Sequence, residues 1–163
     1  MTAIDPILEE LSREAETTRR VLERIPPDKL AWKPHPKSKS VGELAWHVAS
    51  IPRRIAMFVQ EDEVEVTAVK APPMPETAAE IVEGFDRQIA EAKALLAKMD
   101  DSALARTTTM RRAGVTMLSR PRLEFLRSAM LNHSYHHRGQ LSVYLRLLDV
   151  PVPPVYGPTA DES

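Results

Sequence analysis

The first quarter of the chain carries apolar residues at a spacing of three to four positions. These positions are Ile4, Leu8, Leu11, Ala15, Leu22 and Ile25, and charged residues fill most of the positions between them. Residues three and four apart share one face of an α-helix, so this spacing is typical of an amphipathic helix. The pattern predicts a helix over residues 3–25.

Two further segments repeat this periodicity, and each begins with a capping box. A hydroxyl and a carboxylate three positions apart can satisfy the free N–H groups at the start of a helix. Such pairs occur in Ser40-Val41-Gly42-Glu43 and in Thr77-Ala78-Ala79-Glu80. We expect helices over residues 40–59 and 77–99. Pro52 lies inside the first of them and predicts a kink or a break there.

The remainder of the chain is divided by proline. A fourth periodic segment begins at Pro121 and predicts a helix over residues 121–148, followed by a proline-rich tail over 150–163. Between Asp101 and Arg120 the pattern favours either two short extended pieces with a turn or a structured loop. Four long helices and little strand predict an all-α, four-helix bundle that occupies residues 1–163 as one domain.

Composition narrows the possible functions. The 163 residues include no cysteine, which excludes disulfides, thiolate metal sites and a cysteine nucleophile. The net charge of −1 argues against a general polyanion binder. The chain lacks an apolar run of the roughly 20 residues that a membrane helix needs, and its acidic N-terminus does not resemble a signal peptide. A cytoplasmic protein without membrane contact is the expectation.

One part of the chain is nevertheless basic. Six arginines and a single acidic residue, Glu124, occur over residues 106–127; the arginines are Arg106, Arg111, Arg112, Arg120, Arg122 and Arg127. The even overall charge and the lack of a recognised binding motif weigh against a nucleic-acid surface. An anionic substrate near this loop, or a solvated or dimer-facing surface, fits better.

Three histidines are candidates for a metal site. His133 and His137 lie four positions apart and share a face of the fourth predicted helix, and counting at 100° per residue places His137 closer to the apolar stripe than His136. His47 borders the apolar face of the second predicted helix. Three imidazoles from two helices of a bundle would form a His₃ site with open coordination positions. On spacing alone, ordinary half-buried histidines are an equally good interpretation.

Three motifs resemble those of the DinB-like superfamily, also known as DinB/YfiT-like metalloenzymes. They are the Ser40–Ala49 segment around His47, the Asn132–Gln140 segment with its His-x-x-His-His-Arg-Gly-Gln pattern, and the Val152–Glu162 tail, in which Thr159 replaces a usual serine. The resemblance implies an up-down-down-up bundle and a homodimer. It also implies that His47, His133 and His137 bind a divalent metal ion, commonly zinc or nickel.

Members of this superfamily include S-transferases that use a low-molecular-weight thiol. A divalent ion can lower the pKa of water or of a thiol, so the sequence suggests either a hydrolase or an S-transferase with a thiol cosubstrate, acting on a small-molecule substrate. The alternative is a non-catalytic stress or interaction protein with a structural metal.

Several residues around the histidines are candidates for supporting roles. Glu43 could act as a base, although its capping role is the stronger interpretation, and Gln140 and Tyr144 could orient water or substrate or merely pack. Gly139 suggests close helix packing or room for a ligand. Arg138 points away from the histidines and suggests a salt bridge or a dimer contact.

Overall fold

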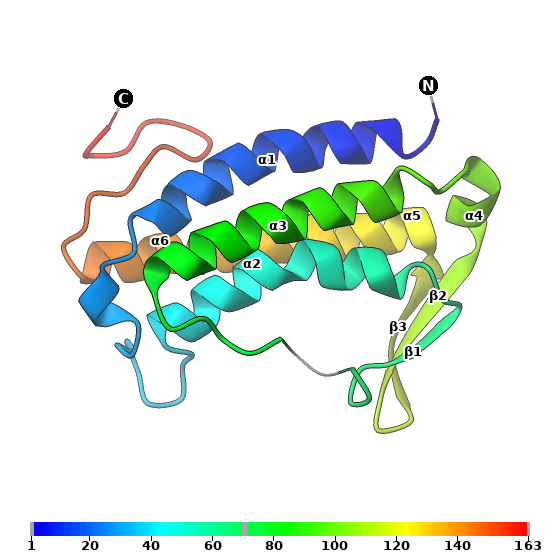
Figure 1. Cartoon of the computed structure of the whole chain (residues 1–163), viewed down its shortest axis with the longest axis horizontal. Coiled ribbons are helices and arrows are strands. Elements are labelled where there is room, and N and C mark those ends of the chain that lie inside the picture. The colour runs from blue at the N-terminus through cyan, green and yellow to red at the C-terminus, as the bar shows by residue number, and fades with distance from the viewer. Residues whose placement is uncertain (1, 70–71, 163) are drawn as a thin grey trace.

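Four long helical segments lie side by side in the computed structural model, which describes residues 2–69 and 72–162 (Figure 1). They are α1 (Asp5–Glu23), α2 (Val41–Phe58), α3 (Ala78–Leu96) and a fourth segment that joins α5 (Arg122–Phe125), the π-helical turn η2 (Leu126–Asn132) and α6 (His133–Leu147). Each segment lies within three residues of its predicted range. Both predicted capping boxes are present, because Ser40 accepts from the N–H of Glu43 and Thr77 from that of Glu80.

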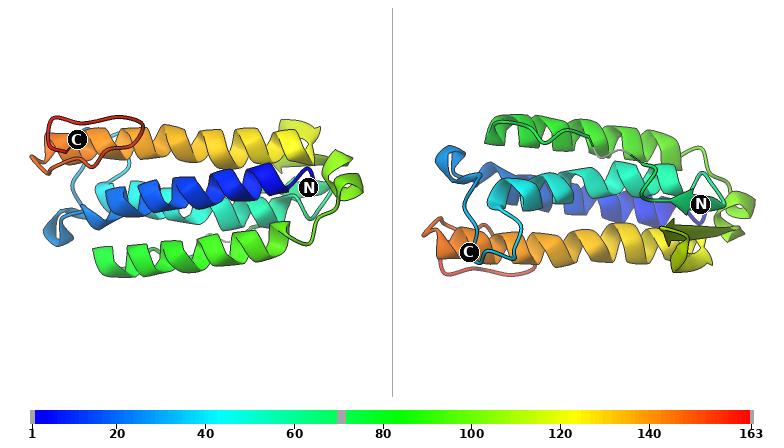
Figure 2. Two further views of the ribbon diagram at one scale, coloured as in Figure 1. Left: turned by 90° about the horizontal axis from the view of Figure 1, so that it is seen from above. Right: turned by 90° about the horizontal axis from the view of Figure 1, so that it is seen from below.

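The helices form a bundle around an apolar core. α2 packs against α3 and α6, and α1 packs against the same two helices. In Figure 1, α1 and the fourth segment run in one direction while α2 and α3 run in the other, which is the up-down-down-up order. Figure 2 shows the same four rods from above and below. The fully buried positions include Leu22, Leu44, Ile51, Ile81, Leu96, Leu126 and Leu141.

The all-α prediction was wrong in one respect, because a small sheet closes one end of the bundle (Figure 1). Strands β2 (Thr107–Arg112) and β3 (Val115–Pro121) pair antiparallel, which confirms the hairpin interpretation of this region. The sequence analysis missed β1 (Glu63–Glu65), which pairs parallel to β2. Three residues are too short to show a strand periodicity. The short helices η1 (Pro27–Lys29) and α4 (Asp101–Ala105) also depart from a simple four-helix bundle.

The hairpin turn is tied to β1 by one carboxylate. Ala113 and Gly114 form a two-residue turn with φ of 49° and 78°. Positive φ at both positions is typical of a type I′ hairpin, and alanine tolerates it poorly. The Glu65 carboxylate accepts hydrogen bonds from the N–H groups of both residues at 3.0 Å. These bonds hold the turn against β1.

The sequence predicted a kink or a break at Pro52, and a break does not occur. α2 continues through this residue as one helix although proline cannot donate the helical hydrogen bond to the carbonyl four positions earlier. Pro52 is buried, as are Ile51 and Ile55 on either side of it. Packing of this apolar segment in the core outweighs the local cost of the proline.

Two of the three helical glycines, Gly84 and Gly139, have opposite surroundings. A Cβ added at Gly84 would lie 2.7 Å from the Trp46 ring, so glycine is needed where α3 approaches α2. A Cβ added at Gly139 would meet nothing within 4 Å. The expectation of close helix packing at Gly139 was therefore wrong, and Gly84 is the residue with that role.

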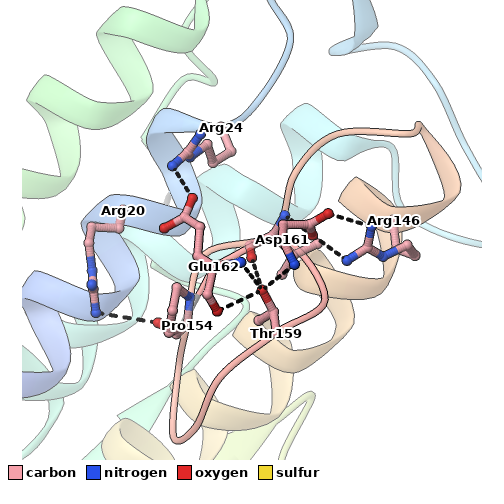
Figure 3. Close-up of polar contacts among 8 residues, drawn as sticks. Arg20, Arg24, Arg146, Pro154, Thr159, Asp161 and Glu162 are labelled. Carbon is pink, nitrogen blue, oxygen red and sulfur yellow. Dashed lines mark hydrogen bonds and ion pairs between the residues drawn. The ribbon is translucent and has the colours of Figure 1, made fainter.

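The tail returns to the bundle and is fixed there by polar contacts (Figure 3). Arg146 of α6 pairs with Asp161, and Arg24 at the end of α1 pairs with Glu162. The Thr159 hydroxyl donates to the carbonyl of Val152 at 2.8 Å and accepts from the N–H of Glu162 at 3.1 Å. The serine-to-threonine change in the motif thus keeps the hydroxyl that organises this turn.

Arg138 joins the tail to the interior. The residue is 1% exposed, and its guanidinium pairs with Glu14 at 2.7 Å and donates to the Tyr156 hydroxyl at 2.7 Å and to Thr18 at 3.1 Å. The predicted salt bridge is present. Its partner Glu14 comes from α1 of the same chain, so the dimer-contact alternative does not describe this residue.

Within the described ranges, no helix is both long enough and apolar enough to cross a bilayer.

Candidate metal centre

Three imidazoles meet between α2 and α6. His47 lies in the second turn of α2, and His133 and His137 lie on one face at the start of α6. The Nε2 atoms of His47 and His133 are 3.4 Å apart, and those of His133 and His137 are 2.8 Å apart. Each ring offers one nitrogen, and all three nitrogens lie within 4.8 Å of one another.

These separations suit one small cation. Tetrahedral ligands with bonds of about 2.0–2.1 Å have donor atoms about 3.3 Å apart. Two of the three separations, 3.4 Å and 2.8 Å, are near that spacing, and the third pair of nitrogens lies within 4.8 Å. Three neutral imidazoles also form the donor set that zinc, nickel and similar ions accept. The residues of this site therefore fit a divalent ion.

A side chain on α6 orients one of the rings. The Nδ1 atom of His137 lies 2.7 Å from Oε1 of Gln140. An amide oxygen can only accept, so Nδ1 carries the proton and Nε2 keeps its lone pair for a metal. Metal-binding histidines usually donate their second N–H in this way. Gln140, an exposed residue, thus contacts the site through His137.

Burial keeps the imidazoles neutral. It lowers the pKa of His47 to about 3, and the nearby charges of His137, Arg54 and His133 act in the same direction. The pKa values of His133 and His137 are lowered as well, chiefly by burial, although the hydrogen bond to Gln140 opposes this at His137. All three rings are therefore deprotonated at neutral pH, which is the form that binds metals.

The π-helical turn leads directly into the site. η2 ends at Asn132, and His133 follows as the first residue of α6. A π-helical turn shifts the phase of the side chains beyond it and is frequent next to functional sites. Sequence counting at a constant 100° per residue could not include this shift.

Three other residues considered from the sequence, Glu43, Tyr144 and His136, do not belong to the group of three histidines. The Glu43 carboxylate accepts from the N–H of Ser40 at 2.7 Å and pairs with Lys33 at 3.5 Å, so it is used in the helix cap. Tyr144 packs edge-to-face on Trp32, with ring centroids 5.8 Å apart. His136 is exposed and outside the group of three.

A cavity of about 320 Å³ opens beside His47 and His133. Its lining is mainly apolar and comes from α2, from the segment after β1, from the hairpin and from η2. The apolar lining residues are Ile55, Phe58, Val66, Val69, Met110, Met117 and Ala129. This volume is within the range of small-molecule sites. The small sheet, which the sequence analysis only partly predicted, supplies a wall of this cavity.

Two arginines also line the cavity, and among the residues that the structure describes no acidic side chain lines it. Arg54 follows His47 by seven positions, which is about two helical turns on the same face. This spacing is visible in the sequence and could have indicated that Arg54 lies near the site. Arg112 belongs to the basic segment noted above, and it reaches the cavity because β2 lies over this end of the bundle.

The structure explains most of the other arginines in that segment. Arg106 and Arg122 both pair with Asp62, Arg111 with Glu63, Arg120 with Glu124, and Arg127 with Glu10. Most of these partners come from outside residues 106–127, so the sequence alone made the region appear more basic than its surface is. The ion pairs leave little free positive charge for a nucleic acid.

Comparison with known proteins agrees with this fold. The chain is 26% identical over 164 residues to the uncharacterized protein YrdA of Bacillus subtilis (strain 168), in an alignment that covers 98% of this chain and 91% of YrdA. A DinB-like protein of Bacillus cereus ATCC 10987 has a similar crystal structure, with a TM-score of 0.74, 27% identity and coverage of 94% of this chain and 97% of the other.

The structure of YjoA, a DinB-like protein from Bacillus subtilis, also has a TM-score of 0.74, with coverage of 93% of this chain and 97% of the other. At 21% identity this likeness concerns the fold alone. The sequence profile of the DinB superfamily matches residues 10–141, which is more than half of the chain. The chain therefore belongs to the DinB superfamily.

Proposed function

We propose that this protein is a divalent-metal-dependent enzyme, either a hydrolase or an S-transferase that uses a low-molecular-weight thiol. His47, His133 and His137 would hold the metal. The observation that carries this proposal is the convergence of three neutral imidazoles at the edge of a cavity large enough for a small molecule. A purely structural site would gain nothing from the cavity.

The chemistry follows from the donor set. A divalent ion held by three neutral ligands keeps its full charge, and it can lower the pKa of a water molecule or a thiol enough to make either a nucleophile at neutral pH. Gln140 would hold the His137 ring in the tautomer that binds. The apolar cavity walls would exclude bulk water from the body of the substrate.

The two reactions differ in the nucleophile. In the hydrolase, water attacks an ester, an amide or a similar bond. In the S-transferase, a thiolate attacks an electrophilic substrate. The chain contains no cysteine, so the thiol of the second reaction must enter as a cosubstrate. Zinc and nickel both suit imidazole ligands.

The metal assignment is tested with tag-free protein. We expect about one zinc or nickel ion per chain by inductively coupled plasma mass spectrometry, and loss of that ion in His133→Ala. His136→Ala is the matched control, because His136 lies on the same helix but outside the group of three. Equal metal content in the two variants would refute the assigned ligands.

The catalytic assignment needs a separate measurement. We compare the turnover of two substrate panels by the metal-loaded protein and by His133→Ala. One panel contains activated esters, and the other contains electrophiles together with an added low-molecular-weight thiol. Turnover that requires the thiol supports the S-transferase, and turnover without it supports the hydrolase. If neither panel shows turnover while chelation unfolds the protein, the non-catalytic alternative with a structural metal is favoured. The homodimer and the cytoplasmic location stay predictions.

A further inference from the structure

We infer that the cavity beside the histidines binds a small organic anion with an apolar body, such as a medium-chain carboxylate, and that Arg54 holds its anionic group. This inference deepens the proposed function, because it names the substrate class of the same site. It rests on that function only for the claim that the anion is a substrate. Binding itself can be tested without turnover.

The first observation is an unpaired, half-buried cation. Arg54 lies on α2 and lines the cavity, and within residues 2–69 and 72–162 its guanidinium has no hydrogen bond or ion pair. Burial lowers the pKa of Arg54, and no carboxylate opposes this effect. The neighbouring Arg53 pairs with Glu91 of α3. A desolvated charge without a partner is unfavourable, so the site favours an incoming anion.

The second observation is the position of this charge. Arg54 lines the same cavity as His47 and His133, and it follows His47 by seven positions on α2. An anionic group bound to Arg54 therefore occupies the cavity that the candidate metal ligands also line. A planar guanidinium can bind a carboxylate through two parallel hydrogen bonds, which fixes the orientation of the ligand as well as its charge.

The third observation is the rest of the cavity. Over residues 2–69 and 72–162, the lining apart from the two histidines and the two arginines is apolar, and no acidic side chain contributes to it. Arg112 is exposed on β2, and it has no ion pair within the described ranges. It adds a second positive charge to the cavity. The charges select an anion, and the apolar walls select a ligand with a hydrocarbon body.

The experiment compares octanoate with octanamide, its neutral counterpart, by isothermal titration calorimetry on the purified protein with its bound metal. We expect octanoate to bind at least ~10-fold more tightly than octanamide, since one charge-assisted hydrogen-bond pair gives about this factor. Arg54→Met is expected to lose the preference for octanoate. Arg53→Met is the matched control and is expected to keep it.

Two further variants keep the result interpretable. Arg54→Lys keeps the charge but loses the planar guanidinium, so we expect the preference for octanoate to weaken without disappearing. Circular dichroism checks that each variant folds. Arg112→Met is expected to weaken octanoate binding by only a few-fold. Equal binding of the two ligands by the wild type, or an unchanged preference in Arg54→Met, would overturn the inference.

A final comparison separates this inference from the metal assignment. Octanoate could bind the metal instead of Arg54, so the titration is repeated with His133→Ala. A preference that persists in His133→Ala but disappears in Arg54→Met supports the arginine. A preference that disappears only in His133→Ala assigns the anion to the metal and overturns the inference. If the wild type holds no metal but still prefers octanoate, the proposed function fails and the anion site stands.

Discussion

At the residue scale, Gly84 and Gly139 give a matched pair of substitutions. In Gly84→Ala the new methyl group would overlap the Trp46 ring, so we expect a loss of about 1–3 kcal/mol in the free energy of unfolding. Gly139→Ala meets no neighbour and removes a flexible residue from a helix, so we expect a gain of up to about 1 kcal/mol. Urea denaturation measures both, and a gain in Gly84→Ala would contradict the packing described here.

Arg138 offers a test of buried charge. Arg138→Met leaves Glu14, which is 18% exposed, without its cation and leaves the Tyr156 hydroxyl without its donor. Breaking one side of a buried ion pair costs about 3–5 kcal/mol, and we expect a loss of this size in urea denaturation. Arg146→Met removes an exposed ion pair to the same tail and serves as the control. Equal losses in the two variants would contradict a special role for Arg138.

Arg138 also shows why motif residues need not be catalytic. It lies one position after His137 in the most specific part of the family motif, but its side chain contacts Glu14 of α1 and Tyr156 of the tail motif instead of the histidines. Two motifs that are separate in the sequence thus meet at one buried ion pair. Their joint presence indicates a shared way of fixing the tail rather than a shared reaction.

At the element scale, Glu65 is expected to control the hairpin. Four hydrogen bonds lower the pKa of its carboxyl to about 2. The largest effect comes from the Thr67 hydroxyl, and the other three bonds come from the N–H groups of Gly114, Thr67 and Ala113. Because the pKa is lowered in the folded state, the stabilisation is complete above the ordinary value of 4.5. It is lost as the pH falls from there towards 2.

The measurement is amide hydrogen exchange at Ala113 and Gly114. We expect the protection factors at these two positions, taken relative to the intrinsic exchange rate at each pH, to fall in Glu65→Ala at neutral pH, and in the wild type only under acid conditions. Amides in the core of α2 should be unaffected in the variant, which makes them the internal control. Unchanged protection of the turn in Glu65→Ala would show that β-pairing alone holds it.

At the scale of the whole molecule, metal removal should lower stability without unfolding the chain. A ligand at 100 to 1,000 times its dissociation constant adds about 3–4 kcal/mol, and for a domain of this size that corresponds to about 6–16 °C in Tm. The apolar core, with residues such as Leu22, Ile81 and Leu141 fully buried, does not depend on the histidines. Calorimetry with and without a chelator measures the shift.

Two results would contradict this prediction. An unchanged Tm would mean that no metal binds the folded state. Complete unfolding on chelation would favour the structural-metal alternative. In His133→Ala the chelator should have no effect on Tm, which separates the site from unspecific metal binding.

Much of the architecture could be predicted from local patterns. Periodicity located the four long helical segments, and hydroxyl–carboxylate pairs located the starts of α2 and α3. The hairpin between α4 and α5 was one of two open interpretations. The short strand β1 could not be predicted, since it is defined by its pairing with residues of β2 that lie 46 positions later, from Glu63 to Thr109, and not by its own three residues.

By itself, the sequence determined the helices, their caps and the identity of three candidate histidines, because these depend on residues within one or two helical turns of each other. Only the tertiary structure decided that the Nε2 atoms converge, that five of the six clustered arginines are paired, and that Arg54 and Arg112 line the same cavity. Each of these depends on contacts between α2, the sheet and α6. Such contacts are made by segments that are far apart in the chain, and no local periodicity records them.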